Sequence, residues 1–133
     1  MAQKYIIGDL IKYKVGGLEF IAEITNTSKY GYCFKAVSDD ISGTLCKEFA
    51  KDIPLTSEIL EKNGWYGATH SKQSDDATKI LYKTFKRKGY PTIKASQDLK
   101  ITCELSPFIV KLESVSDLQH LLFGLGINSE MEV

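Results

Sequence analysis

Apolar and polar residues alternate along much of the first fifty positions, which is the pattern of half-buried β-strands. Residues 11–15 and 18–24 each alternate, and they flank the pair Gly16-Gly17. Two such runs around two glycines predict a β-hairpin, because glycine accepts a positive φ at little cost. Further strands are predicted at residues 30–37 and 44–49. We therefore expect a small SH3-like barrel or a bent antiparallel sheet.

Strand patterns return in the second half of the chain after a polar stretch. Residues 67–77 contain almost no large apolar side chain and predict a loop or linker. Alternation resumes in residues 80–85, and the turn-forming sequence from Lys88 to Pro91 ends that run. Three more apolar runs follow, at residues 92–95, 99–105 and 108–112. These runs predict a second antiparallel β-unit.

A short helix is predicted between the two β-rich halves, in the stretch DIPLTSEILEKNGW. Thr56 is a good N-cap, and Glu58 lies in the first turn, where the helix dipole favours a carboxylate. Gly64 fits the left-handed position after the helix, and Trp65 then packs back towards Leu60, as in a Schellman ending. A helix of about two turns is not stable alone. We interpret it as a corner that closes the first sheet and leads into the second half.

A second helix is predicted near the C-terminus, where leucines recur at i, i+3, i+4 and i+7. Ser116 and Gln119 have the spacing of a capping box, and Gly124 and Gly126 mark the end of the helix. The predicted fold class is therefore β-rich α+β. We expect an N-terminal barrel-like unit with its closing helix at residues 1–66, a linker at 67–77, and strands plus an amphipathic helix at 78–133.

Composition and charge place the chain among soluble globular proteins. It has 133 residues, 43% of them hydrophobic, and 17 Lys and Arg residues balance 17 Asp and Glu residues. It has no run of 18 apolar residues and no basic-then-apolar leader, so we expect a cytoplasmic protein. Neutral overall charge gives no sign of nucleic-acid binding.

The residues that usually carry catalysis or bind metals show no recognisable arrangement. Cys33, Cys46 and Cys103 lie in strand-like runs without a CxxC spacing, which predicts reduced thiols. His70 lies in the polar stretch and His120 lies on the C-terminal helix, and neither pairs with a cysteine at a known spacing. We predict no catalytic residue, no metal and no cofactor.

The segment from Lys79 to Lys100 is the candidate interaction surface. It contains seven Lys and Arg residues against one Asp, a local charge of +6. Cations interleaved with aromatic residues suit phosphate contacts and base stacking, or an acidic protein surface. A solvated strand edge also accounts for the lysines, because lysines there discourage edge-to-edge pairing. The residues predicted to contact a partner are Tyr82, Lys83, Phe85, Lys86, Arg87, Lys88, Tyr90 and Lys94.

Two segments resemble a family of small uncharacterised proteins from phages and mobile elements of Bacteroidetes. The first is PLTSEILEKNGW, where the family pattern is PLT, acidic residues, an apolar pair, Lys, a spacer, Gly and an aromatic residue. The second is the C-terminal helix, where His120, Leu122 and Gly124 depart from the family pattern. Its matching residues are Leu118, Gln119, Leu121, Phe123 and Leu125. The resemblance implies an origin in a phage or mobile element, and it identifies no catalytic residue in this chain.

A non-enzymatic accessory protein is the function that these expectations favour. Mobile-element origin, small size and the lack of a catalytic pattern suggest a protein that binds a host protein and inhibits a defence nuclease, such as a CRISPR effector. One alternative is a nucleic-acid-binding accessory protein that uses the basic segment. Another is a sponge for a signalling nucleotide, which would need a pocket lined by aromatic and cationic residues.

Overall fold

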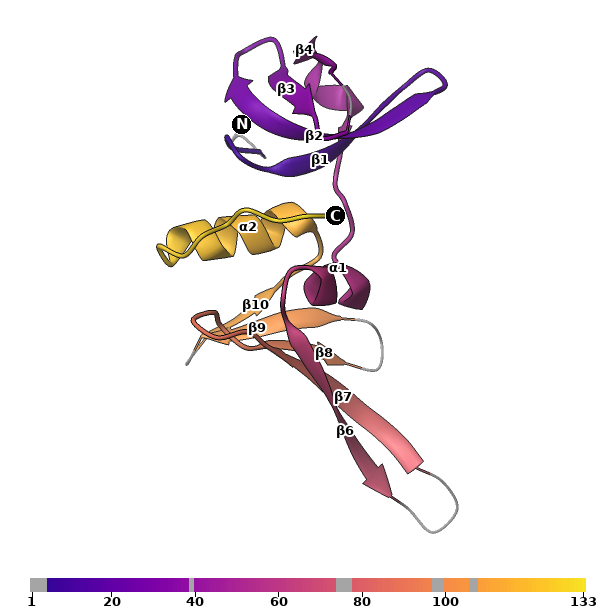
Figure 1. Cartoon of the computed structure of the whole chain (residues 1–133), viewed down its shortest axis with the longest axis vertical. Helices are drawn as coiled ribbons and strands as arrows, with labels where there is room; N and C mark the ends of the chain where they lie inside the picture. Colours follow the sequence, from indigo (N-terminus) through magenta and orange to yellow (C-terminus); the bar gives the residue numbers. More distant parts are fainter. Residues whose placement is uncertain (1–4, 39, 74–77, 97–99, 106–107) are drawn as a thin grey trace. The chain divides into compact units, whose positions relative to one another are not determined.

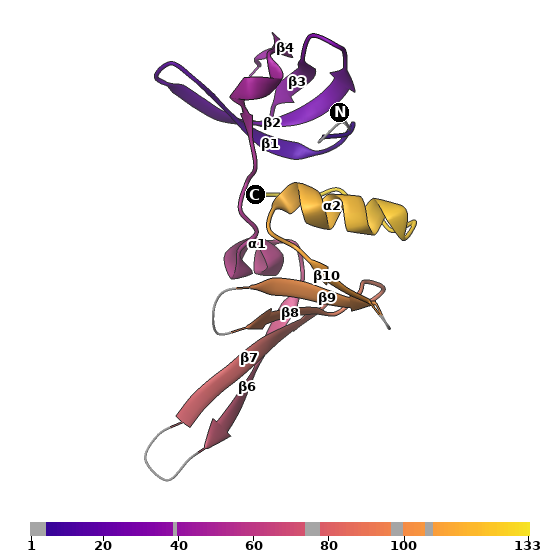
Figure 2. The ribbon, with the colours of Figure 1, turned by 180° about the vertical axis from the view of Figure 1, so that it is seen from behind.

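The chain forms two compact units, which Figures 1 and 2 show from opposite sides. The computed structural model describes residues 5–38, 40–73, 78–96, 100–105 and 108–133, with the side chains of 69–73 and 78–82 outside that description. The first unit contains residues 1–54 and 114–131, and the second contains residues 55–113 and 132–133. None of the described helices has the length and apolar character needed to cross a membrane.

The first unit is built on a five-stranded antiparallel sheet with the strand order β4-β3-β2-β1-β5 (Figure 1). A short 3-10 helix, η1 (Lys47–Phe49), lies between its last two strands in sequence. Among the described residues, the edge strands β4 and β5 do not pair with each other, so the sheet is open and not a closed barrel. The strands are β1 (Leu10–Val15), β2 (Leu18–Thr27), β3 (Tyr32–Ala36), β4 (Ser42–Leu45) and β5 (Ala50–Lys51).

The predicted Gly-Gly hairpin is confirmed by the pairing of β1 with β2. Val15 lies opposite Leu18 across a two-residue turn, and Gly16 has a φ of 58°. A positive φ at this place matches the right-handed twist of the two strands, which explains why a glycine stands there.

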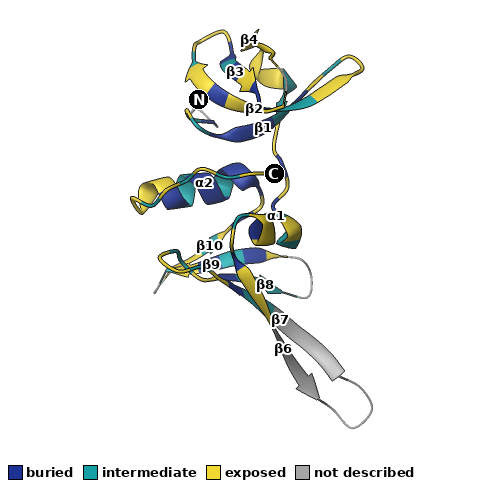
Figure 3. Cartoon of the chain, viewed as in Figure 1, coloured by how far each residue is buried: buried dark blue, intermediate teal, exposed yellow. Residues whose placement is uncertain are grey.

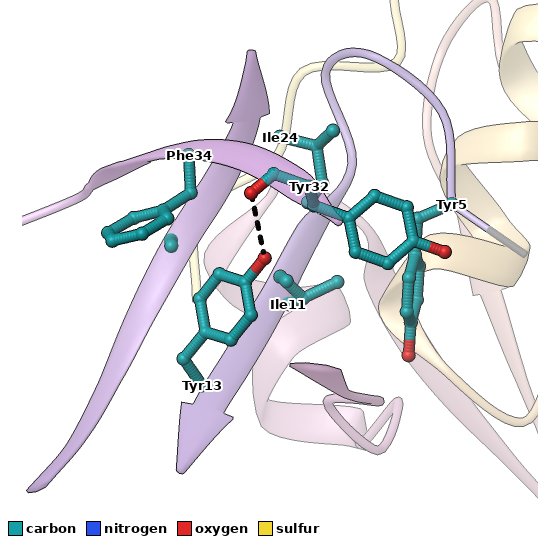
Figure 4. Close-up of a cluster of buried hydrophobic side chains, with 7 residues drawn as sticks. Tyr5, Ile11, Tyr13, Ile24, Tyr32 and Phe34 are labelled. Atoms are coloured by element: carbon teal, nitrogen blue, oxygen red, sulfur yellow. Dashed lines mark hydrogen bonds between the residues drawn. The ribbon is translucent and has the colours of Figure 1, made fainter. Parts of the chain in front are cut away.

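The inner face of this sheet carries an aromatic core (Figure 4). The rings of Tyr13 and Phe34 lie 4.9 Å apart, and the Tyr13 hydroxyl donates a hydrogen bond to the Tyr32 carbonyl at 3.5 Å. Burial raises the pKa of Tyr13 to about 12. These contacts satisfy the polar ends of large side chains inside an apolar core. Its buried members are Tyr5, Ile11, Tyr13, Ala22, Ile24, Tyr32 and Phe34.

Helix α2 (Val115–Gly124) belongs to the first unit, and its start differs from the predicted one. The capping box is formed by Ser114 and Asp117, whose side chains each accept a hydrogen bond from the other residue's main-chain N–H at 3.1 Å. Ser116 was the predicted cap, but it lies within the helix and is buried. The predicted partner, Gln119, is buried too, and it has a different role.

Gln119 ties α2 to the start of β1 and to the residues just before it. Its Oε1 accepts a hydrogen bond from the Leu10 N–H at 2.8 Å. Its Nε2 donates to the carbonyl of Gly8 at 2.9 Å and to that of Ser129 at 3.2 Å. One side chain therefore holds three main-chain groups. Among the described residues, every buried side-chain nitrogen and oxygen atom has a hydrogen-bond partner.

The second unit contains α1 (Ser57–Lys62) and a second antiparallel sheet with the order β10-β9-β8-β7-β6. The short helix has the predicted ends. The Thr56 side chain accepts from the Ile59 N–H at 3.3 Å, and Trp65 N–H donates to the Leu60 carbonyl at 3.0 Å. The strands are β6 (Tyr66–Gln73), β7 (Thr78–Lys86), β8 (Ile93–Ser96), β9 (Ile101–Leu105) and β10 (Phe108–Lys111).

The second sheet has one buried face and one open face (Figure 3). Phe85, Ile93 and Cys103 lie opposite one another on three adjacent strands, and each is fully buried. Side chains alternate between faces, so their immediate neighbours in sequence point to the other side. The β-rich α+β fold class is confirmed, with two five-stranded antiparallel sheets, a short helix between them in sequence and a C-terminal helix.

Two predicted boundaries differ from the structure. The expected loop at residues 67–77 is a strand as far as Gln73, and residues 74–77 lie outside the described part. β6 pairs with β7 along its length, and main-chain pairing does not require apolar side chains. The domain division also differs, because the short helix belongs to the second unit and the C-terminal helix to the first.

Candidate functional site

The end of α1 positions an aromatic pair in the second unit. Gly64 has a φ of 94°, and its N–H donates to the Glu61 carbonyl at 3.1 Å. This Schellman ending turns the chain so that Trp65 is buried. The Trp65 ring meets the Tyr90 ring edge-on at 5.2 Å, and Trp65 Nε1 donates to the Pro91 carbonyl at 3.5 Å. The two rings therefore have fixed positions.

Arg87 lies over both rings. The carbon of its guanidinium group is 4.0 Å from the Tyr90 ring centre and 5.1 Å from the Trp65 ring centre. Arg87 is the first residue of a tight turn. In this turn the Tyr90 N–H donates to the Arg87 carbonyl at 3.0 Å, and Gly89 has a φ of 83°. No carboxylate of a described residue forms an ion pair with Arg87. Its charge is held in place by aromatic contacts and is left available to an anion.

The open face of the second sheet adds more cations. Thr102 lies opposite Lys94 on one side and opposite Lys111 on the other, so the two lysines belong to one row across the sheet. Lys86 is exposed and lies opposite Tyr66, which is 80% exposed. We call Tyr66, Lys86, Lys94 and Lys111 the open-face residues. Lys88 is also exposed, in the turn that follows Arg87.

Two of the residues predicted to contact a partner lie on the opposite face. Phe85 is fully buried and belongs to the core. Lys83 packs its ammonium 5.3 Å from the Phe85 ring centre and lies 3.5 Å from a carboxylate oxygen of Glu61. Tyr82 pairs with Ser96 in the sheet, but its side chain lies outside the described residues.

The structure therefore divides the predicted surface into parts. It brings Arg87, Lys88 and Tyr90 together at one turn and places Lys86 and Lys94 on the open face. Sequence reasoning missed Tyr66 and Lys111 as members of this surface and treated Trp65 only as scaffold. Strand alternation marks both missed residues as candidates, but the register that puts Tyr66 opposite Lys86, and Lys111 in the same row as Lys94, is a property of the folded sheet.

A second polar arrangement lies in the first unit, at the start of β1. Asp9 is 1% exposed, and its Oδ2 lies 2.6 Å from His120 Nε2 and 2.9 Å from the Ile6 N–H. Burial raises the pKa of the Asp9 carboxyl, and the hydrogen bonds from Ile6 and His120 oppose that rise. No hydroxyl or thiol of a described residue hydrogen-bonds to His120.

A groove of about 660 Å³ lies in the first unit, beside the hydrogen bonds of Gln119. Its apolar walls include Ile7, Val37 and Phe123, each more than half exposed. Main-chain segment 128–131, which follows α2, forms another wall. Neither Asp9 nor His120 lines this groove.

Potential metal and redox residues are dispersed in the described structure. Within the described ranges, no group of three or more His, Cys, Asp or Glu side chains has an arrangement that could hold a metal ion. Cys33, Cys46 and Cys103 are free thiols, with Cys103 buried and Cys46 exposed. The side chain of His70 lies outside the described residues.

Comparisons with known proteins add no relative. No family model, no curated protein and no solved structure matches this chain. The resemblance to mobile-element proteins therefore stays a prediction from two short segments.

Proposed function

We propose that this chain is a non-enzymatic protein, encoded by a phage or mobile element, that binds an acidic surface of a host protein. The binding surface consists of the turn residues Arg87, Lys88 and Tyr90, together with Lys86, which precedes them at the end of β7. One observation carries the proposal: Arg87 is fixed over two aromatic rings and has no acidic partner among the described residues.

The geometry of Arg87 suits recognition of a carboxylate. A guanidinium group presents a planar fork of N–H donors that matches a carboxylate with two hydrogen bonds. Most arginines lose side-chain freedom when they bind, whereas the contacts of Arg87 with Trp65 and Tyr90 restrict that freedom beforehand. Arg, Tyr and Trp are also the residues most enriched among those that dominate protein interfaces.

A host defence nuclease is the partner class that we propose. Two segments of the chain resemble proteins of phages and mobile elements. Such elements encounter the defence nucleases of their hosts, so this origin supports a defence nuclease as the partner. Nucleases commonly hold divalent metal ions, and carboxylates are the usual ligands for Mg²⁺. A cationic surface complements such an acidic centre, and occupation of that centre would block cleavage of nucleic acid.

A phage-plating assay tests inhibition directly. Host cells that carry an active CRISPR system targeted to a phage would express either this protein or a charge-reversal variant, Lys86→Glu with Lys88→Glu. We expect the natural protein to raise plating by at least about tenfold and the variant to abolish that gain, because two exposed cations become anions.

The matched control is Lys14→Glu with Lys51→Glu, which makes the same charge change at exposed positions in the first unit. It should retain the activity of the natural protein. Unchanged plating with the natural protein, across the defence nucleases tested, would rule out this proposal.

Nucleic-acid binding is a second candidate function, and the open face favours it. Tyr66 is 80% exposed beside Lys86, so a base can stack on its ring while the lysines contact phosphates. Binding of single-stranded DNA or RNA would weaken steeply with salt, because cation release accompanies each phosphate contact. Fluorescence anisotropy at 50 and 200 mM salt measures this dependence, and no binding at the lower salt would exclude the candidate.

A further inference from the structure

Residues 132–133 belong to the second unit and lie against the end of α1. Asn63 holds Glu132 through both of its main-chain groups. Asn63 Nδ2 donates to the Glu132 carbonyl at 2.7 Å, and the Glu132 N–H donates to Asn63 Oδ1 at 2.7 Å. Lys62 Nζ donates to the main-chain oxygen of Val133 at 2.8 Å. All three hydrogen bonds reach main-chain groups, so a segment of another sequence can make them too.

The amide group of Asn63 is oriented by the helix that it ends. Its Nδ2 also donates to the Ile59 carbonyl in the last turn of α1, at 2.7 Å, and the side chain is half-buried. This contact fixes which end of the amide presents the donor and which the acceptor. One amide can pair with the N–H and C=O of a single residue where both groups point the same way, as in an extended strand. The end of α1 is therefore a preorganised site for the main chain of an extended segment.

Two cations lie beside this site. Lys62 is exposed and contacts the bound segment directly. Gly64 follows Asn63, and a Cβ atom at Gly64 would lie 3.4 Å from Arg87 Nε, so the guanidinium group of Arg87 is close by. These charges favour an acidic residue in a segment that Asn63 holds. The residue of this chain that occupies the site, Glu132, is itself acidic.

Negative charges near the site are weaker or already compensated. The C-terminal end of a helix carries about half a negative charge, which is less than the two full charges of Lys62 and Arg87. Glu61 of α1 forms an ion pair with Lys83, with an N–O distance of 3.5 Å. The electrostatic balance around Asn63 therefore favours an anion.

We propose that the end of α1 binds an extended acidic segment of the partner protein, with Asn63 paired to its main chain and Arg87 beside its carboxylate. Glu132 and Val133 act as an internal competitor that leaves when the partner's segment enters. This inference rests on the proposed function, because it specifies the form of the acidic surface that Arg87 meets. It adds a regulatory step, since the site is occupied by the chain's own residues until a partner displaces them.

The bound segment has the properties of one that can be displaced. Glu132 and Val133 belong to no helix or strand, and neither residue is buried. Exposed segments with few apolar contacts open locally without unfolding of the rest of the protein. Because these residues remain attached to the chain, they compete at an effective concentration on the order of millimolar.

Amide-resolved NMR with the segment supplied in trans tests the proposal. A variant that lacks residues 132–133 is titrated with Ser-Glu-Met-Glu-Val, the sequence of residues 129–133, capped at both ends. We expect the side-chain amide signals of Asn63 and the main-chain amide signal of Gly64 to shift. The natural protein should bind the peptide at least about tenfold more weakly, because its own segment occupies the site. The peptide Ser-Glu-Met-Lys-Val should bind the shortened chain roughly three- to tenfold more weakly than the first peptide.

Variants of the shortened chain separate main-chain pairing from charge. Asn63→Asp replaces the donor that meets the segment carbonyl by an oxygen, so it should abolish binding of both peptides. Arg87→Gln removes one positive charge, so the two peptides should then bind more nearly equally. The matched control is Asn26→Ala, at an exposed asparagine of the first unit, which should leave binding unchanged.

Four results would each overturn the inference: no shift at Asn63 and Gly64, equal binding by the shortened and natural chains, equal binding of the two peptides to the shortened chain, or binding unaltered by Asn63→Asp. A dimer of the natural protein that Asn63→Asp dissolves would also overturn it, in favour of exchange of residues 132–133 between two copies. The proposed function fails separately. A host partner captured through Lys86 and Lys88, without peptide binding at Asn63, would leave that function standing and refute this inference. Peptide binding without any captured host protein would do the reverse.

Discussion

At the scale of single residues, close neighbours decide which side chains are tolerated in the first unit. Gly31 is buried, and a Cβ atom there would lie 2.1 Å from the carbonyl oxygen of Leu45. That oxygen belongs to the main chain of β4 and cannot move without disturbing the sheet. Asp9 is constrained differently, because a charge with 1% exposure depends on His120 and the Ile6 N–H for compensation.

Replacement of Gly31 by alanine should destabilise the first unit by roughly 2–4 kcal/mol, because the new methyl group collides with main-chain atoms. Urea unfolding followed by circular dichroism measures the change. The control is Gly17→Ala, since a Cβ at position 17 has no atom within 4 Å. Equal effects of the two substitutions would show that the close approach of Gly31 to Leu45 is not present in solution.

The raised pKa of Asp9 predicts a pH dependence of stability. The folded protein holds this proton more tightly than the unfolded chain, so Asp9 favours folding most below the unfolded pKa of about 3.8. That contribution is lost as the pH rises through the higher folded pKa.

Asp9→Asn should remove this fall in the free energy of unfolding, measured by urea titration across the acid range. His120→Ala should extend the fall to higher pH, because one favourable contact of the carboxylate is gone. An identical pH profile for the natural protein and Asp9→Asn would contradict the assignment.

At the scale of elements, local chemistry predicted most strands and both helices. The Gly-Gly hairpin and the ends of α1 follow from residues adjacent in sequence, and both are confirmed. The capping box of α2 was predicted two residues late, because Ser114-Asp117 and Ser116-Gln119 both have a suitable spacing and only tertiary contacts separate them. β6 was predicted as a loop because its sequence is polar. Its main-chain pairing with β7 makes it a strand all the same.

Gln119 is the residue whose loss should most weaken the attachment of α2 within the first unit. Gln119→Ala leaves the Leu10 N–H and the Gly8 carbonyl without a side-chain partner, at a cost of about 2–3 kcal/mol. Hydrogen exchange of the Leu10 amide should accelerate in parallel. Gly124→Ala is the control on the same helix, where an open position and better helix propensity predict a small gain in stability. Slow exchange of Leu10 in Gln119→Ala would refute this role.

At the scale of the whole molecule, a neutral chain is divided into two units of opposite sign. The first unit has seven Lys and Arg residues against nine Asp and Glu residues, and the second has ten against eight. The sequence located the basic segment correctly in the second half. It did not separate Phe85 and Lys83 from the open face or add Lys111 to it, because strand register decides these positions. The fixed position of Arg87 depends on the ring of Tyr90 in the same turn and on the ring of Trp65, whose approach from another part of the chain was equally invisible in sequence.

Affinity capture from a Bacteroidetes host lysate, quantified by mass spectrometry, tests the central claim that the second unit binds a host protein. Three baits are compared: the natural protein, Lys86→Glu with Lys88→Glu in the second unit, and Lys14→Glu with Lys51→Glu in the first. We expect one host protein to be captured equally by the natural protein and the first-unit variant, and at least about tenfold less by the second-unit variant. Equal capture by all three baits, or no specific capture by the natural protein, would contradict the account.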